Sequence, residues 1–321
     1  MDNPLNSCLA RLANLQIPEN KASWGAATSF KCPSKPLLLL TVIDMAAIGS
    51  FAENMVEPSF ELARTYSRYW KTVAPSPTDT NLAATFIGLE EEGFWKMTGL
   101  KETPEQLPKN SMGNLHKSYL GAKIDPEIFP LLSEKKSRKT MRETLISTYF
   151  ADEMHAPLLD VALINHAAAI YSKELLSEAQ VPAIKTGRGE EINRRISSLG
   201  FDSAIVELYS HRCAICGIKL MTPEGHSAVN ANRIMPKRCG GNDHPSNGIA
   251  LCKICSWSFD NGLIGIGEEY EVLIPTAVRL NGNLPGHILI FKGRTVSKPQ
   301  QEVFRPSQKN LSWHRQNILR D

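Results

Sequence analysis

The run Asn247-Gly-Ile-Ala-Leu-Cys-Lys-Ile-Cys-Ser-Trp-Ser-Phe-Asp-Asn-Gly-Leu263 decides the fold of the C-terminal half of the chain. It contains Cys252 and Cys255, and a second Cys-x-x-Cys pair, Cys213 and Cys216, lies upstream. Two residues between paired cysteines let both sulfurs reach one ion from a tight turn. The two pairs together therefore predict a single metal site with four thiolate ligands.

Four soft thiolates are the ligand set that tetrahedral Zn²⁺ prefers. Because all four positions are filled by protein, no position stays open for water, and we expect a structural zinc ion held by Cys213, Cys216, Cys252 and Cys255. Buried free cysteines or a redox pair are the alternative reading. The seven cysteines of the chain are an odd number, which argues against a complete disulfide framework.

The residues between and after the two pairs resemble the HNH endonuclease family. The resemblance rests on the run 247–263 and on the upstream stretch Asn232-Arg233-Ile234-Met235-Pro236. It also continues into the C-terminal Leu311-Ser-Trp-His-Arg315, which is similar to the ending of predicted restriction endonucleases of this type. The resemblance implies a ββα fold, in which a hairpin and a helix enclose one catalytic metal ion.

Two histidines that the HNH resemblance implies are replaced in this chain. Arg233 stands where the family has the general base, and Ser256 stands where a metal-binding histidine follows the second cysteine pair; Asn247, the middle residue, is retained. A guanidinium stays protonated and cannot take a proton from water, and a hydroxyl is a weak neutral ligand. Both replacements argue against a catalytic divalent ion and against ordinary metal-assisted hydrolysis.

The N-terminal stretch Pro33-Ser-Lys-Pro-Leu-Leu-Leu-Leu40 is similar to the opening of a helical module found upstream of HNH domains. In the best described members this module is a sulfur-binding domain that recognises phosphorothioate-modified DNA through an apolar pocket rimmed by basic residues. The Tyr-Pro-Phe element of that pocket corresponds here to Ala84-Thr85-Phe86. The resemblance implies Lys31 and Lys35 as donors to phosphate.

The composition is that of a globular protein: 42% of the residues are hydrophobic, 21% are charged, and the net charge is +3. The first twenty residues carry no secretion signal, and the longest apolar run, 36–48, is too short to cross a bilayer. With paired cysteines, this favours a reducing, cytoplasmic location. Residues 181–256 contain ten Lys or Arg against six Asp or Glu, a local basic bias that is compatible with a polyanion-facing surface.

Periodicity and turn residues predict an α+β protein. Helices are expected over 36–43, 59–73, 126–132, 137–150, 157–178 and 190–209, a short hairpin over 85–97, and strand-like alternation at 270–274 and 287–291. Residues 74–83 and the Pro- and Gly-containing segment 181–189 are expected to be a loop and a linker. Together with the two resemblances, these patterns predict a mostly helical, sulfur-binding-domain-like domain over 1–180. A zinc-stapled, HNH-like ββα domain with a C-terminal β extension is expected over 181–321.

The leading functional hypothesis is a DNA-binding protein, related to modification-dependent restriction endonucleases, whose nuclease centre is inactive. Double-stranded DNA, modified or not, is the expected partner, and a homodimer is compatible with the family, although no coiled-coil heptad demands one. The basic residues expected to contact phosphate are Lys31, Lys35, Lys135, Lys136, Arg138, Lys139, Arg233, Lys237, Arg238 and Lys253; solvated basic faces are the alternative for them.

Two other functions stay open at this point. The chain is an active endonuclease if it uses non-standard ligands, drawn from Asn232, Asn247, Asp243 or His244. Alternatively, it is a protein-interaction scaffold that has inherited the fold without the chemistry.

Overall fold

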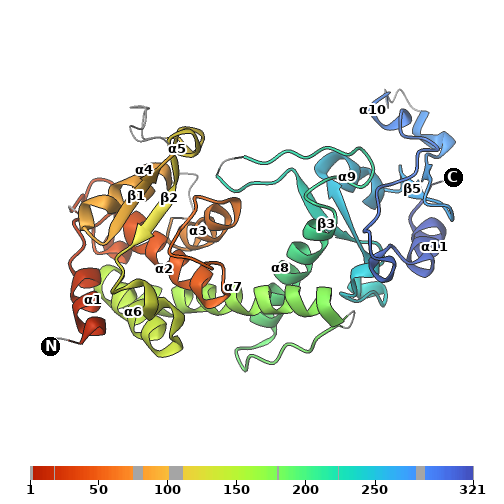
Figure 1. Cartoon of the computed structure of the whole chain (residues 1–321). Coiled ribbons are helices and arrows are strands. Elements are labelled where there is room, and N and C mark those ends of the chain that lie inside the picture. The colour runs from red at the N-terminus through yellow and green to blue at the C-terminus, as the bar shows by residue number, and fades with distance from the viewer. Residues whose placement is uncertain are drawn as a thin grey trace. The chain divides into compact units, whose positions relative to one another are not determined.

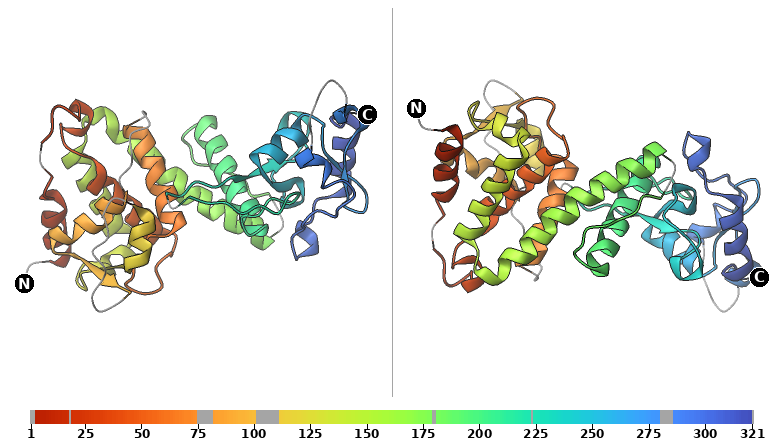
Figure 2. Two further views of the ribbon diagram at one scale, coloured as in Figure 1. Left: turned by 90° about the horizontal axis from the view of Figure 1, so that it is seen from above. Right: turned by 90° about the horizontal axis from the view of Figure 1, so that it is seen from below.

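The computed structural model describes residues 3–17, 19–74, 82–100, 111–178, 181–222, 224–279 and 286–320 (Figure 1). The chain forms two compact units: unit 1 contains residues 1–166 and 222–226, and unit 2 contains 167–221 and 227–321. This division falls within helix α7 (Asp152–Glu178), ahead of residue 180, which the sequence suggested as a boundary. Helix α7 itself runs unbroken (Figure 2).

Unit 1 is built around α2 (Ser34–Ala47), in which residues 36–45 are all buried. Helices α3 (Phe60–Val73), α4 (Leu82–Gly88) and α6 (Lys135–Tyr149) pack against α2, and α1 (Pro4–Ala13) packs against α6. The apolar run therefore becomes the central helix, because no side of it is left polar enough to face water. The helices predicted over 36–43, 59–73, 137–150 and 157–178 are confirmed.

One charged side chain, Asp44, lies inside the core of unit 1. Its carboxylate accepts hydrogen bonds from Tyr69 Oη (2.7 Å), Asn165 Nδ2 (2.9 Å) and Arg142 Nη2 (2.8 Å). Burial raises the pKa of Asp44, while the neighbouring guanidinium and the hydrogen bonds lower it. This network connects α2, α3, α6 and α7, so it fixes the relative positions of four helices of the unit.

The hairpin predicted over 85–97 is wrong. Residues 82–88 form helix α4, and residues 89–92 continue it as a 3₁₀ turn. Only the second half is a strand, β1 (Trp95–Gly99), and it pairs antiparallel with β2 (Tyr119–Ile124), which follows the short helix α5 (Met112–Ser118). The buried Phe86 and Trp95 rings meet edge to face, 5.0 Å between centroids, so the aromatic residues that suggested a hairpin pack a helix onto a strand instead.

Two other predictions fall on turns. Residues 126–132 were predicted to be a helix, but only a 3₁₀ turn over residues 129–133 forms there. Most of the expected loop 74–83 lies outside the described residues. Residues 181–189 contain no regular helix or strand. In the described part of the chain, no helix has both the length and the apolar character needed to cross a membrane.

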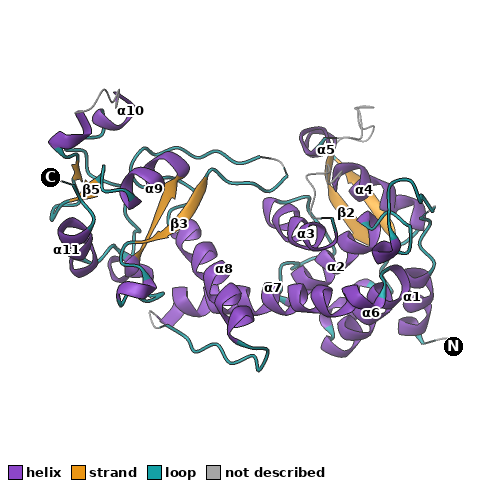
Figure 3. Cartoon of the chain, turned by 180° about the vertical axis from the view of Figure 1, so that it is seen from behind, coloured by secondary structure: helices purple, strands orange, loops and turns teal. Residues whose placement is uncertain are grey.

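Unit 2 contains a ββα arrangement, confirming the predicted fold class (Figure 3). Strand β3 (Val229–Arg233) pairs antiparallel with β4 (Gly248–Cys252), and α9 (Lys253–Asp260) follows β4 directly. Helix α8 (Glu190–Leu208), predicted over 190–209, packs against both strands. The contact is close at Gly248, where a Cβ atom would meet Ile205 Cδ1 at 2.3 Å, so a larger residue there would have to displace the Ile205 side chain of the helix.

The remainder of unit 2 differs from the expected β extension. Two-residue strands β5 (Gly265–Ile266) and β6 (Val272–Leu273) pair, so the alternation predicted over 270–274 gives only a minimal strand. The alternation predicted over 287–291 is wrong, because α10 (Gly286–Leu289) begins there. The last helix, α11 (Gln308–Asn317), packs against β5 and carries Leu311 and His314 into the core.

Candidate functional site

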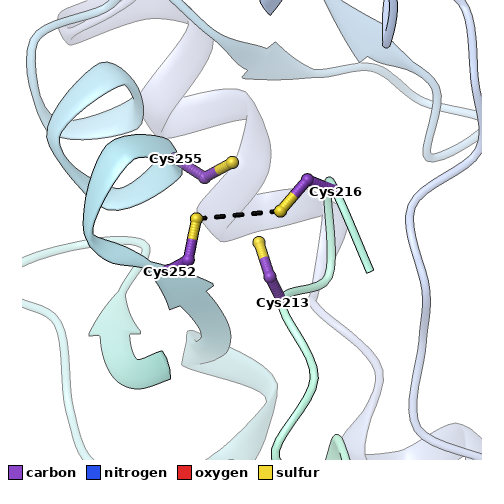
Figure 4. Close-up of side chains that lie close together, drawn as sticks. All are labelled: Cys213, Cys216, Cys252 and Cys255. Atoms are coloured by element: carbon purple, nitrogen blue, oxygen red, sulfur yellow. Dashed lines mark hydrogen bonds between the residues drawn. The ribbon is translucent and has the colours of Figure 1, made fainter. Parts of the chain in front are cut away.

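The four predicted cysteines meet at the junction of β4 and α9. The sulfur atoms of Cys213, Cys216, Cys252 and Cys255 all lie within 4.8 Å of one another (Figure 4). Cys216 Sγ and Cys252 Sγ are 3.7 Å apart, close to the edge of about 3.8 Å that Zn–S bonds of 2.3 Å give in a tetrahedron. The donor set and its spacing therefore fit a structural zinc ion, which would fasten the loop after α8 to the base of α9.

The local hydrogen bonds also suit thiolate ligands. The pKa of Cys213 is lowered, first because the Cys255 thiol donates to it and further because backbone N–H groups surround it, although burial opposes this effect. The backbone supports the same turn, since the N–H of Gly217 donates to Cys213 O (2.9 Å) and that of Ala214 to Ala250 O (2.8 Å). The first pair is thus held against β4 by the main chain as well.

Asn247, which the HNH resemblance implied as a site residue, closes the loop that connects β3 to β4. Its Oδ1 accepts from the Met235 N–H (2.9 Å), and its Nδ2 donates to Met235 O and Asn242 O (both 2.9 Å). The side chain is 1% exposed. Every one of these contacts is to the backbone of the same loop, so Asn247 acts structurally and does not present a ligand atom to solvent.

Asn232 and Ser256 come together across β3 and α9, and they are joined by Asp260. The Asn232 amide donates to Ser256 Oγ (2.7 Å) and to both carboxylate oxygens of Asp260 (3.3 Å). Ser256 and Asp260 are four residues apart on α9, which places both on one face of the helix. We call this group the Asn232–Ser256–Asp260 cluster.

Asp260 was missed as a site residue by the sequence reasoning, although it belongs to the run that decided the fold. The signal was its spacing of four residues from Ser256 on the helix that the ββα resemblance implies. Burial raises the pKa of Asp260, and the hydrogen bonds from Asn232 and Ser256 lower it in part. The cluster therefore offers one carboxylate, one amide and one hydroxyl, an oxygen-rich set without an imidazole.

Arg233 faces away from this cluster. Successive residues of a strand point to opposite sides, and the Arg233 guanidinium binds Asp243, with Nη2 2.7 Å and Nε 2.8 Å from Oδ1. It also stacks over the Phe201 ring of α8, 4.3 Å from the centroid. The other carboxylate oxygen, Asp243 Oδ2, accepts from Lys237 Nζ (2.8 Å) and Tyr171 Oη (2.9 Å).

These contacts also decide which alternative ligands come together. Asp243 is 2% exposed and already shared by two cations and a phenol. His244 Nδ1 accepts from the Ser246 N–H (3.1 Å) and lies 2.8 Å from its hydroxyl. Of the four residues suggested as non-standard ligands, only Asn232 lies in the Asn232–Ser256–Asp260 cluster; Asn247, Asp243 and His244 bind elsewhere.

The basic residues expected to contact phosphate differ in their solvent exposure and in whether they already bind groups within the chain. Lys35 is bound to Glu92 and to Gln16 O, with 13% of its side chain exposed, and Arg138 donates to Leu132 O. Lys139 pairs with Glu143 on an exposed helix surface. Lys31 is partly buried, Lys237 is half-exposed beside Asp243, and the remaining members are exposed: Lys135, Lys136, Arg238 and Lys253.

Residues 213–267 match the family model described as HNH endonuclease, which confirms the domain that the run 247–263 predicted. A solved structure described as a modification dependent TagI restriction endonuclease is similar to this chain at 24% sequence identity and a TM-score of 0.27. That similarity covers 37% of this chain and 37% of the other. No curated protein matches the chain.

Proposed function

We propose that this chain, whose residues 213–267 form an HNH endonuclease domain, is a DNA-binding protein whose nuclease centre does not cut. The observation that carries the proposal is the direction of Arg233. At the position of the family's general base, a guanidinium is held by Asp243 and Phe201 on the face of β3 opposite the Asn232–Ser256–Asp260 cluster. Neither side of the strand then offers the imidazole that the family uses as its general base, and the one carboxylate of the cluster, Asp260, is hydrogen-bonded by Asn232 and Ser256.

DNA binding is supported by the exposed cations of both units. Lys253 and Arg238 are exposed in unit 2, and Lys135 and Lys136 are exposed at the start of α6 in unit 1. Contacts of this kind position a duplex through its phosphates without reading the sequence. In this proposal Arg233 and Lys35 both add little, because each is already paired with a carboxylate within the chain.

Recognition of a modified backbone, such as a phosphorothioate, is the finer part of the proposal and belongs to unit 1. The Phe86 of the Ala84-Thr85-Phe86 element is fully buried against Trp95. A sulfur atom would therefore have to be contacted by other apolar residues of the unit. Comparing affinity for duplexes that differ only in one phosphorothioate tests this part independently of general DNA binding.

The binding experiment is fluorescence anisotropy of a labelled 25-base-pair duplex at 50 and 200 mM NaCl. Because phosphate contacts release counterions, affinity should fall about a thousandfold or more between these salts if six or more contacts form. Lys253→Glu should weaken binding further, whereas Lys292→Glu, the same charge change on an exposed residue outside the proposed surface, should not. Affinity that is insensitive to salt and to Lys253→Glu would refute the proposal.

A second candidate, an active endonuclease, is favoured by the Asn232–Ser256–Asp260 cluster. Asp260 and the carbonyl oxygen of a rotated Asn232 amide are suitable ligands for Mg²⁺ or Mn²⁺. Plasmid nicking with Mg²⁺, Mn²⁺ or Ni²⁺ separates the two candidates. Metal-dependent nicks that disappear in Asp260→Asn, with DNA affinity preserved, would favour the enzyme, and their absence from the wild type supports the binding protein.

A further inference from the structure

Helix α9 exposes two large apolar side chains beside the Asn232–Ser256–Asp260 cluster. Trp257 is 61% exposed and Ile254 is 57% exposed, whereas Cys255, Ser258 and Phe259 form the buried side of the same helix. Isolated exposed aliphatic residues are ordinary on protein surfaces. An exposed tryptophan three residues from an exposed isoleucine is a larger apolar surface, and on a helix the two are neighbours.

The order of side chains around α9 is informative. At about 100° per residue, the solvent-facing arc contains first Ser256 and Asp260, then Lys253, then Trp257 and finally Ile254. Lys253 is exposed and stands between the polar cluster and the tryptophan. The solvent-facing side of this short helix thus presents, one after another around its axis, the helix residues of the Asn232–Ser256–Asp260 cluster, a cation and an aromatic ring.

This order matches the chemistry of a nucleotide strand. A lysine binds phosphate, and an aromatic ring stacks on a base, whose π-face is available whatever its identity. We infer that Trp257 stacks on a DNA base adjacent to the phosphodiester that lies over the Asn232–Ser256–Asp260 cluster, with Ile254 widening the apolar contact. This inference rests on the proposed DNA-binding function and specifies how the HNH domain contacts the DNA strand.

The contact requires that the base leave its normal stack. Apolar side chains that insert at a base step separate neighbouring bases and fix the position of the strand on the protein. Lys253 would hold the adjacent phosphate, so the position of Trp257 on α9 sets which phosphodiester faces Asp260. Trp257 is therefore a positioning residue for the bound strand and has no chemical role.

Tryptophan emission reports on this contact in the full-length protein. Of the five tryptophans, Trp257 is the exposed one; Trp70 and Trp95 are buried, and Trp24 and Trp313 are partly buried. Stacking on a base quenches indole fluorescence. Saturating 25-base-pair duplex should therefore quench the emission of the wild type, and Trp257→Phe should lose most of that quenching while keeping its affinity, because a phenyl ring still stacks.

Affinity is measured on the same samples by anisotropy of the labelled duplex. Trp257→Ala should weaken binding about tenfold, the size of one lost stacking contact. Ile290→Ala, a truncation of a residue with the same 57% exposure beyond α10, should leave affinity unchanged. Circular dichroism of each variant verifies that the fold is retained.

The outcomes separate this inference from the function on which it rests. If the wild type fails to bind the duplex at 50 mM NaCl, both are overturned. If the wild type binds but Trp257→Ala binds equally well, or Trp257→Phe is quenched as strongly as the wild type, DNA binding stands and the stacking contact is wrong. Salt-dependent binding, quenching that needs Trp257 and a tenfold loss in Trp257→Ala together support the inference.

Discussion

Ser256 lies between Asn232 and Asp260 in the Asn232–Ser256–Asp260 cluster and contacts both. Its hydroxyl sits 2.7 Å from the Asn232 amide and four residues before Asp260, on the same face of α9. The surrounding geometry is thus arranged around a group that binds divalent ions only weakly. At this position the identity of one side chain, rather than the fold, decides whether a divalent ion is bound weakly or firmly.

A histidine at this position should restore metal binding. We expect Ser256→His to bind Ni²⁺ or Mn²⁺ at the cluster, because imidazole and the Asp260 carboxylate at i and i+4 approach one ion from one helix face. Isothermal titration calorimetry on the zinc-loaded protein measures the affinity of the variant for Ni²⁺ or Mn²⁺. The matched control is Ser256→His with Asp260→Asn, which should lose the gain; equal affinity in both variants would contradict the ligand assignment.

Arg233 is expected to stabilise the fold through Asp243. Arg233→Ala leaves the Asp243 carboxylate, which is 2% exposed, without its buried cationic partner. The loss should lower the unfolding free energy by about 3 kcal/mol. Lys237→Ala removes the half-exposed partner and should cost about 1 kcal/mol or less. Urea unfolding measures the unfolding free energy of both variants. A larger loss in Lys237→Ala would show that Lys237, and not Arg233, is the main partner that stabilises Asp243.

At the scale of elements, α11 holds α9 in place. The His314 ring stacks on Phe259 with 3.6 Å between centroids, and its Nε2–H donates to Phe259 O (2.9 Å). Arg315 Nη1 donates to Ile266 O (2.9 Å) at β5. The C-terminal Leu311–Arg315 stretch therefore braces the helix that carries Ser256 and Asp260, which explains its presence beside the HNH domain in physical terms.

The same contact predicts a pH dependence of stability. The pKa of His314 is lowered from 6.5 to about 4, first by burial and further by Arg315, despite the hydrogen bond to Phe259. The unfolded chain then binds this proton more readily than the folded chain, so stability falls as pH drops from about 6.5 toward 4, by up to about 3 kcal/mol. Urea unfolding at pH 7 and pH 5 measures the change.

Variants identify His314 as the source. His314→Gln keeps a donor for Phe259 O without a titratable ring, so its unfolding free energy should depend less on pH in this range. His287→Gln removes an exposed histidine of α10 and should behave as the wild type does. A pH dependence that is unchanged in His314→Gln would mean that another group carries it.

At the scale of the molecule, the two units are stabilised differently. Unit 1 has a large apolar core with the Asp44 network inside it, whereas the hairpin and α9 of unit 2 meet at the four cysteines. Structural zinc supplies folding free energy outright, because its ligands do not gather in the unfolded chain. Loss of the ion should therefore affect the two units unequally.

Chelation tests this difference. After treatment with a strong zinc chelator, amide hydrogen exchange should accelerate in β3, β4 and α9, while α2 and α6 keep their protection. Cys252→Ser should have the same effect without chelator, and Cys239→Ser, which changes an exposed cysteine outside the cluster, should have none. Equal loss of protection in both units would show that they unfold together.

Much of this architecture could be predicted from local patterns. The apolar run 36–43, the capped helix after Ser59 and the paired cysteines each carry their own signal within a few residues, and the four cysteines and the HNH match are confirmed. The strand partner of β1 could not be predicted, because β2 lies about twenty residues downstream and the aromatic residues of α4 suit a strand equally well.

The sequence by itself determined the four clustered cysteines and the HNH domain, because these are matters of residue identity and short spacing. Only the tertiary structure decided that Arg233 binds Asp243, that Asn247 closes its own loop, and that Asp260 joins Asn232 and Ser256. The physical reason is that a side chain's partner depends on which face of a strand or helix it occupies once distant segments have packed. That choice is made by the whole fold and leaves no local signal.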